Sequence, residues 1–307
     1  MNVLIDTDPG TDDALALMMA INSTEMAICG ITTVGGNTRI EDTTTNVLRL
    51  LDHLGVDDLN VYKGSSRPIE GCFHNGANIF KTAYDVHGAD GLGLTLSKPK
   101  LKIQETPASE YLISAASNYR GDLNIIALGP LTNIAKAINS EPKLTDWISK
   151  IIVMGGAINV PGNVTPYAEF NIYNDPLAAD IVLNSGIEVT LVGLDVTTQT
   201  SLSRQNLSWL GTESDTAKLA QQFISSRLNV LRAQDKYFLH DPLAIAASIQ
   251  PDMLSYEYAS IVVKIEDGPQ RGRTIATFGQ GPVKVAIAVE VKRAKKLIRR
   301  LLIGNRG

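Results

Sequence analysis

The feature that most constrains the fold is a series of short, almost continuously apolar segments, each separated from the next by a helical pattern. The segments LNIIALG and IEVTLVGL are typical, because their apolar residues occupy neighbouring positions and not only alternate ones. Segments of this kind form strands that are buried on both faces of a parallel sheet. Repeated strand–helix units therefore predict a doubly wound α/β sheet.

The expected strands share this apolar character and cover residues 2–7, 27–33, 123–128, 151–154, 187–194, 260–265 and 283–289. The expected helices have apolar residues at helical spacing and cover residues 12–21, 41–54, 108–118, 131–139, 175–184, 216–231 and 241–248. No linker or repeat divides the chain, so residues 1–307 are expected to form a single Rossmann-like α/β domain with an open, mostly parallel sheet flanked by helices. Two stretches, 64–98 and 197–240, are interpreted as inserted loops that could act as mobile lids over a site.

Composition excludes several classes of function. The formal net charge is −4, so a nucleic-acid-binding surface is not expected. Two cysteines, Cys29 and Cys72, do not make a disulfide framework, and Cys29 is expected to be a buried thiol. Met1 leads directly into a strand without a signal peptide, and no apolar run approaches the length of a membrane span, so a cytoplasmic protein is expected. The basic stretch 292–300 is interpreted as the solvated face of a final amphipathic helix.

The segment DTDPGTDD places Asp6, Asp8, Asp12 and Asp13 where the first strand ends and the first helix begins. In an open α/β sheet, ligands bind at this edge. Four like charges repel one another unless a cation or a hydrogen-bonded ligand holds them, and carboxylates alone suit Ca²⁺ or Mg²⁺. Helix capping explains Asp12 or Asp13 but does not explain Asp6 and Asp8, which favours a metal or polyol site.

Other polar groups follow later strands. They are Gly35-Gly36-Asn37, Gly129-Pro130-Leu131-Thr132-Asn133, Gly155-Gly156, Asn163, Glu169-Phe170-Asn171 and His240-Asp241-Pro242. Each has a structural alternative when taken alone, such as a turn for the glycine pairs or a helix cap for Thr132-Asn133 and Asp241. Their shared position at strand ends predicts that they converge on one crevice, and Asn, Glu and Asp side chains there suit the hydroxyls of a ribose.

The motifs that are missing agree with a sugar site. The sequence has no Walker A lysine, no GxGxxG after the first strand and no G-x-S-x-G elbow. Its four histidines show no zinc-ligand spacing.

At this point the chain resembles the inosine-uridine-preferring nucleoside hydrolases over nearly its whole length. DTDPGTDDALAL resembles the N-terminal signature of that family, and TTVGGN, GPLTN, VMGGA, AEFN and HDP follow in the family's order. The resemblance implies hydrolysis of the N-glycosidic bond of ribonucleosides to free base and ribose, with a tightly bound Ca²⁺ at the bottom of the pocket.

The resemblance also implies a set of site residues. The protein ligands of Ca²⁺ would be Asp8, Asp13, Asp241 and the backbone carbonyl of Leu128, where the family often has Thr or Val. The groups that would meet the ribose hydroxyls are Asp12, Asn37, Asn163, Glu169, Asn171 and the backbone at Met154.

The expected chemistry follows from these residue types. The metal would lower the pKa of a bound water, and Asp8 would take its proton as general base. The water would attack C1′, and the surrounding carboxylates would stabilise an oxocarbenium-like ribose. His240 would assist the leaving base, which resembles the inosine-uridine branch of the family.

Base recognition is the least defined part of the site. His87, in VHGADG, is expected in a loop near the base or on the surface, Phe170 against the sugar or in the core, and Tyr237 and Gln234 near the base. Pyrimidine nucleosides, inosine or both are the expected substrates. The resemblance further implies a homodimer or homotetramer, whereas the net charge and the lack of a long apolar run predict no nucleic-acid or membrane partner.

Two alternatives remain open from the residues. One is a phosphohydrolase of the haloacid dehalogenase type, because Asp6 and Asp8 form a DxD after the first strand. The other is a nucleoside-binding protein of the same fold without catalysis, although the retained Asp8 and metal ligands disfavour it.

Overall fold

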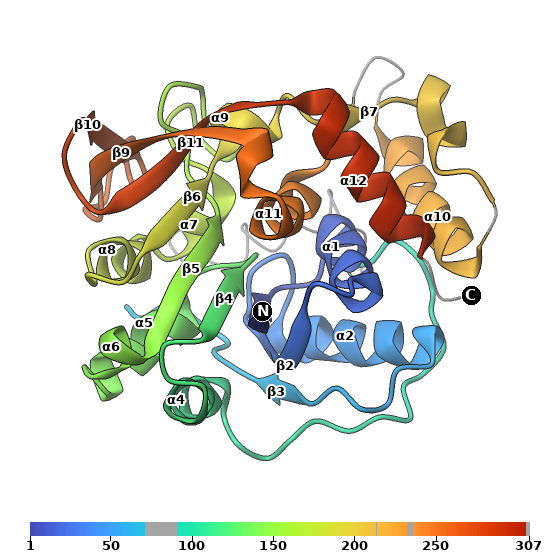
Figure 1. The fold of residues 1–307 in the computed structure, drawn as a ribbon, viewed down its shortest axis with the longest axis horizontal. Helices are drawn as coiled ribbons and strands as arrows, with labels where there is room; N and C mark the ends of the chain where they lie inside the picture. Colours follow the sequence, from blue (N-terminus) through green and yellow to red (C-terminus); the bar gives the residue numbers. More distant parts are fainter. Residues whose placement is uncertain (71–90, 213, 232–235, 305–307) are drawn as a thin grey trace.

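The computed structural model of the protein describes residues 1–70, 91–212, 214–231 and 236–304. Within these residues nine strands form one twisted sheet (Figure 1). In spatial order they are β10 (Thr274–Phe278), β9 (Leu254–Val263), β11 (Val283–Val289), β6 (Val189–Val192), β5 (Ile148–Met154), β4 (Leu123–Ala127), β1 (Asn2–Thr7), β2 (Ala27–Thr33) and β3 (Val61–Lys63).

The sheet is mostly parallel, as the sequence predicts. Every neighbouring pair from β3 to β11 is parallel, whereas β9 runs antiparallel to both β11 and β10. The chain lays β2 and β3 on one side of β1 and then crosses to place β4 on its other side. Such a reversal of strand order opens a crevice at the carboxyl ends of the two diverging strands, here β1 and β4.

Helices cover both faces of the sheet and give it two hydrophobic cores. One core contains residues of α1 (Thr11–Asn22), α2 (Ile40–Leu54), α10 (Asp215–Val230), α11 (His240–Ile249) and α12 (Val291–Ile303). The other contains residues of α4 (Ala108–Asn118), α5 (Thr132–Ser140), α6 (Leu144–Trp147) and α8 (Pro176–Leu183). Neighbouring residues of β1 alternate between them, since Val3 and Ile5 enter the first core and Leu4 the second. Figure 1 shows the two helical layers on either side of the sheet.

Most expected elements are present, with shifts of a few residues at their ends. The expected strand 260–265 overlaps the longer β9 only over residues 260–263. The sequence did not predict β3, β10, or the two-stranded sheet of β7 (Ser201–Leu202) and β8 (Tyr237–Phe238). It also missed α6, α7 (Phe170–Asn174), α9 (Leu194–Thr197) and the 3-10 helices Arg204–Leu210 and Pro251–Met253. Most of these elements are too short to show a period in the sequence.

The basic C-terminal stretch is an amphipathic helix, α12, as expected. Its apolar side is buried at Leu297, Ile298 and Leu301, whereas Arg293 and Arg300 form exposed ion pairs with acidic residues. Across the described residues, the helices are all too short or too polar to cross a membrane. Cys29 is only partly buried, so the expectation of a buried thiol is wrong, and Cys72 lies outside the described residues.

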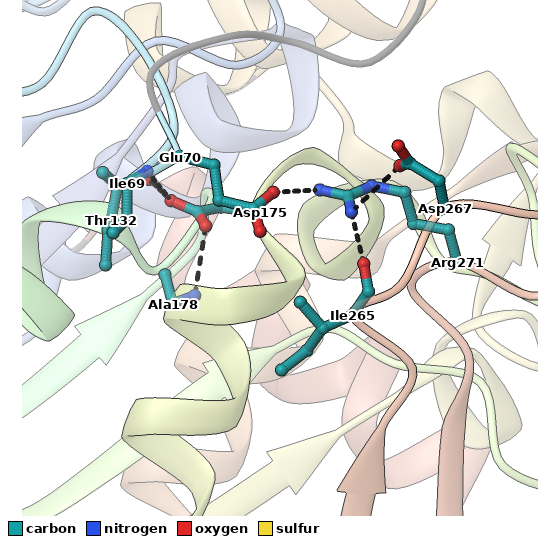
Figure 2. A network of polar contacts seen from close by, with 8 residues as sticks. All are labelled: Ile69, Glu70, Thr132, Asp175, Ala178, Ile265, Asp267 and Arg271. Carbon is teal, nitrogen blue, oxygen red and sulfur yellow. Dashed lines mark hydrogen bonds and ion pairs between the residues drawn. The ribbon is translucent and has the colours of Figure 1, made fainter.

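A polar network fixes residues 69–70 of the first inserted stretch (Figure 2). The carboxylate of Asp175 accepts hydrogen bonds from Ile69 N (2.9 Å), Thr132 Oγ1 (2.6 Å) and Ala178 N (3.1 Å). Next to it the buried Arg271 forms an ion pair with Glu70, at 2.9 Å between Nη2 and Oε2. Residues 69–70 are therefore tied both to the start of α8 and to the turn between β9 and β10.

The second stretch, 197–240, is largely folded. It contains β7, a 3-10 helix, α10 and β8, and Leu219, Phe223 and Leu228 of α10 enter the core shared with α1 and α12. A lid function for 64–98 or 197–240 stays a prediction.

Candidate active site

The aspartates of DTDPGTDD lie where the topology opens the crevice. The backbone leaves β1 at Thr7, turns at Pro9 and Gly10, and enters α1 at Thr11. The carboxylate of Asp13 accepts hydrogen bonds from Gly10 N (2.9 Å), Thr7 Oγ1 (2.5 Å) and Asn37 Nδ2 (3.1 Å). Asp13 therefore caps the helix start, as the structural alternative proposed, and also contacts the polar residues after β2.

Asp8 is buried deeper and has one unused oxygen. Its Oδ2 accepts a hydrogen bond from Asn37 N at 2.7 Å, whereas Oδ1 is buried without a hydrogen-bond partner among the described residues. The glycines of VGGN and GPLTN allow this fit. A Cβ at Gly36 would lie 2.0 Å from Asp8 Oδ2, and one at Gly129 would lie 2.6 Å from Oδ1. These two glycines are required by close packing on Asp8, a role that a simple turn does not explain.

Asp241, in the first turn of α11, lies close to Asp12 and Asp13, and we call these three residues the acidic cluster. Asp12, Asp13 and Asp241 each offer a carboxylate oxygen, and the three oxygens lie within 4.8 Å of one another. Burial raises the pKa of Asp8 and Asp241 well above the usual range, and repulsion by Asp13 raises both further. Burial and Asp13 also raise the pKa of Asp12 to about 7.

This donor set fits a hard divalent cation. All of its donors are carboxylate oxygens, they repel one another, and the Oδ1 atom of Asp8 lacks a partner among the residues that the structure describes. Asp12 belongs to the tightest group of oxygens, together with the expected ligands Asp13 and Asp241. Asp8 interacts electrostatically with Asp13 and Asp241 from outside that group.

Asp6, in contrast, faces away from the ligand site. Its Oδ1 accepts hydrogen bonds from Thr32 Oγ1 (2.6 Å) and Asn133 Nδ2 (2.8 Å). Asn133 also donates to the Thr33 carbonyl and accepts from Ser65 N. Neither Thr132 nor Asn133 caps α5, and Asp241 does not cap α11, so these three capping alternatives are wrong.

A cavity of about 250 Å³ opens above the acidic cluster. Eleven of the expected residues line it: Asp12, Asn37, Leu128, Met154, Asn163, Glu169, Phe170, Asn171, Tyr237, His240 and Asp241. Asp8 and Asp13 lie behind this lining, 1% exposed each. The sequence did not single out Thr11, Val164, Arg227, Leu231, Lys236 and Phe238, which also line the cavity. His87 and Gln234 lie outside the described residues.

One half of the cavity is formed by residues at the ends of strands. We call Asp12, Asn37, Leu128 and Met154, which follow or end β1, β2, β4 and β5, the strand-end half. Asn171 Nδ2 joins two of these strands, because it donates to the carbonyls of Leu128 (2.7 Å) and Met154 (3.1 Å).

The loop 155–169 forms the wall next to the strand-end half. The carboxylate of Glu169 caps α7 by accepting hydrogen bonds from Asn171 N (2.9 Å) and Ile172 N (3.2 Å), and it also accepts one from Gly156 N (3.1 Å). Burial nevertheless raises the pKa of Glu169. Asn163 Oδ1 accepts a hydrogen bond from Phe170 N at 2.9 Å. Both polar side chains are thus oriented by backbone N–H groups at the start of α7.

The opposite half comes from the 197–240 stretch. We call Arg227, Leu231, Lys236, Tyr237, Phe238 and His240 the insertion half. Nδ1 of His240 lies 2.8 Å from Thr197 Oγ1, and its ring lies 5.5 Å from that of Phe238 between centroids. Burial lowers the pKa of His240 to about 4, which favours the neutral ring. Tyr237 is buried, and its hydroxyl donates to Thr11 Oγ1 at 3.5 Å.

Comparison with known proteins gives matches over nearly the whole chain. The family model described as "Inosine-uridine preferring nucleoside hydrolase" matches residues 3–296. Uridine nucleosidase 1 of Arabidopsis thaliana is 37% identical over 319 residues, covering 98% of this chain and 93% of that protein. A solved plant nucleoside hydrolase is 35% identical with a TM-score of 0.90, and a purine-preferring ribonucleoside hydrolase from Gardnerella vaginalis is 32% identical with a TM-score of 0.91. Each alignment with a solved structure covers 98% of both chains.

Proposed function

The chain belongs to the inosine-uridine preferring nucleoside hydrolase family and is a nucleoside hydrolase, and we propose that it cleaves ribonucleosides with the aid of a bound Ca²⁺. The observation that carries the cation and the mechanism is the group of Asp12, Asp13 and Asp241 carboxylates at the cavity, together with Asp8, whose Oδ1 atom has no partner in the described part of the chain. Because the chain belongs to this family, the alternative of a phosphohydrolase of the haloacid dehalogenase type is excluded.

Asp8, Asp13, Asp241 and the Leu128 carbonyl would hold the cation, with Asp12 beside them. When bound, such a cation makes a water molecule a better nucleophile by lowering its pKa and offsets the repulsion among the carboxylates. Leu128 contributes only its backbone, so its side chain is free to differ among relatives. In this structure the same carbonyl accepts from Asn171, which orients it at the end of β4.

Asp8 is the proposed general base. One of its oxygens is fixed by Asn37 N, and the other is free to accept the proton of the attacking water. The water oxygen forms a bond to C1′ while the bond from C1′ to the base nitrogen breaks, and the base keeps the electron pair of that bond. The base then takes up a proton from solvent and Asp8 releases its proton to solvent, so ribose and free base are the products. Positive charge develops on the sugar in between, and the carboxylates of the cluster stabilise it.

The polar residues beside Asp8 are the proposed ribose site. Their oxygens and amide groups can pair with hydroxyls, and phosphate-binding motifs are absent from the sequence. The residues proposed to contact the ribose are Asp12, Asn37, Asn163, Glu169 and Asn171 through their polar side chains, Met154 through its backbone, and Phe170 through its ring.

The base is proposed to lie in the insertion half, which contains the apolar or aromatic side chains of Leu231, Tyr237 and Phe238. His240 donates a hydrogen bond to the departing base, and Tyr237 contacts it from β8. Uridine and inosine are the proposed substrates. The named activity of the Arabidopsis relative favours uridine, whereas the Gardnerella enzyme is purine-preferring at a similar identity. A cytoplasmic homodimer or homotetramer remains the expected form of the protein.

The test is hydrolysis of uridine, cytidine, inosine and adenosine in phosphate-free buffer made with ¹⁸O-labelled water. We expect free base together with ribose that carries ¹⁸O, and we expect chelation of Ca²⁺ to abolish the release. Base release that requires inorganic phosphate would overturn the hydrolytic mechanism. Release that continues after verified removal of divalent cations would overturn the role of the cation.

A further inference from the structure

The short helix α9 contacts two parts of the cavity, the loop 155–169 and the insertion half. It follows β6 and begins after Gly193, and its Asp195 and Thr197 side chains are buried. Residues two positions apart on a helix are rotated by about 200°, so these side chains point in nearly opposite directions. Asp195 makes its hydrogen bonds with the loop 155–169, and Thr197 makes its hydrogen bond with His240 of the insertion half.

Asp195 holds the start of the loop 155–169. Its Oδ2 accepts a hydrogen bond from Ile158 N at 2.9 Å, and its Oδ1 accepts one from Asn159 N at 2.8 Å. The carbonyl of Gly156 accepts from Leu194 N at 2.9 Å, which adds a backbone contact with the same helix. The loop then runs on to Asn163, which lines the cavity. Both carboxylate oxygens of Asp195 are thus used to place this wall.

Thr197 holds the catalytic histidine on the other side. Its hydroxyl lies 2.8 Å from His240 Nδ1, and the backbone before His240 is fixed by a hydrogen bond from Leu239 N to the Thr200 carbonyl at 2.9 Å. With Nδ1 engaged, Nε2 is the nitrogen left for a ligand in the cavity. When the hydroxyl donates to Nδ1, Nε2 carries the ring proton and can donate a hydrogen bond to a departing base.

We propose that α9 is a positioning element of the active site, in which Asp195 sets the loop that carries Asn163 and Thr197 sets the orientation and tautomer of His240. This inference rests on the proposed function of His240. The two residues should therefore have separable effects. Loss of the Thr197 hydroxyl acts on the leaving group, whereas loss of the Asp195 charge acts on substrate binding.

The first test compares Thr197→Val with Thr197→Ser. Valine keeps the shape of threonine without the hydroxyl, and serine keeps the hydroxyl. We expect Thr197→Val to lower kcat/KM for uridine about 10- to 100-fold. The value of kcat/KM for p-nitrophenyl riboside should change less than about threefold, because p-nitrophenolate leaves without assistance. Thr197→Ser should restore most of the uridine activity.

Thr198→Val is the matched control. Thr198 is the exposed next residue, and its hydroxyl donates to the Leu194 carbonyl within the same helix at 2.7 Å. We expect Thr198→Val to leave kcat/KM unchanged for both substrates. Equal losses on both substrates in Thr197→Val, or an unchanged uridine rate, would overturn the role of Thr197.

The second test uses Asp195→Asn, which keeps the size of the side chain but offers only one acceptor to the two N–H groups. We expect KM for uridine and p-nitrophenyl riboside to rise together, about tenfold, with kcat changed less than about threefold. A fall in kcat confined to uridine would overturn the division of roles. If the unmodified protein hydrolyses neither substrate, the proposed function itself fails before any variant is compared.

Discussion

The two halves of the cavity are built in different ways. The strand-end half follows from the pairing of neighbouring parallel strands, whose register places Asp6 beside Thr32 on one side and beside Ala127 on the other. The insertion half does not follow from strand pairing in the main sheet but from packing between short elements, as where Thr197 Oγ1 of α9 lies 2.8 Å from His240 Nδ1 at the start of α11. Parallel pairing alone brings strand ends to one edge, whereas the insertion half forms only when α9, α10 and β8 have packed on the rest.

The difference predicts different consequences of substitution. Substitutions in the strand-end half should lower the rate of hydrolysis of every riboside by a similar factor, because that half is proposed to hold the sugar and the attacking water. Changes in the insertion half should depend on the base or leaving group.

The largest effect is expected from Asp8→Ala. Removing the proposed base should lower kcat for uridine and p-nitrophenyl riboside alike, by roughly 10²–10⁴-fold. The variant should fold, because burial and repulsion by Asp13 already disfavour an ionised Asp8 when no cation is bound. Steady-state kinetics and circular dichroism check both points. A kcat near that of the unmodified protein would contradict the role of Asp8.

A cation effect on stability is expected next. Ca²⁺ at about 100 times its dissociation constant should stabilise the folded protein by about 2.7 kcal/mol, because it binds the folded state alone. Thermal unfolding with Ca²⁺ and with chelator measures this. The double variant Asp13→Asn and Asp241→Asn should lose the response, whereas the exposed Asp146→Asn should keep it. The same Tm with Ca²⁺ and with chelator in the unmodified protein would contradict the proposed site.

Asn133→Ala tests the support beneath the strand-end half. Asn133 bonds Asp6, Thr33 and Ser65, and a buried group left without its partner costs about 1–3 kcal/mol. We expect a loss of about 2 kcal/mol in the free energy of unfolding, measured with urea. The folded variant should retain its preference between uridine and p-nitrophenyl riboside. A changed preference would show that the two halves are coupled through the sheet.

The smallest effect is expected from Leu128→Val. Only the carbonyl of Leu128 is proposed to act, and the buried side chain loses one methylene, which costs about 1 kcal/mol. Denaturant unfolding should show that loss, while kcat stays within about threefold. A large fall in kcat would mean that the side chain itself shapes the site.

The strand-end half was the part that could be predicted from sequence. Asn37 and Met154 stand at strand ends, and both line the cavity. Asp6 shows the limit of this reasoning, because the alternation of side chains along β1 directs it to Thr32 and Asn133 instead. The sequence gives the position of an aspartate along a strand but does not show which neighbours meet each carboxylate.

The insertion half was only partly predictable. Its histidine could be picked out because it precedes Asp241 in a motif, whereas Arg227, Lys236 and Phe238 belong to no motif and line the cavity through tertiary packing. Thr197 was missed because α9 has only four residues, too few to show a helical period.

The division of roles between the two halves can be tested with one measurement, the ratio of kcat/KM for uridine to that for p-nitrophenyl riboside in the unmodified protein, Asp8→Ala and His240→Ala. We expect Asp8→Ala to lower both values and keep the ratio. We expect His240→Ala to lower the ratio about 10²-fold or more by reducing uridine hydrolysis alone. Equal losses on both substrates in His240→Ala would contradict the account.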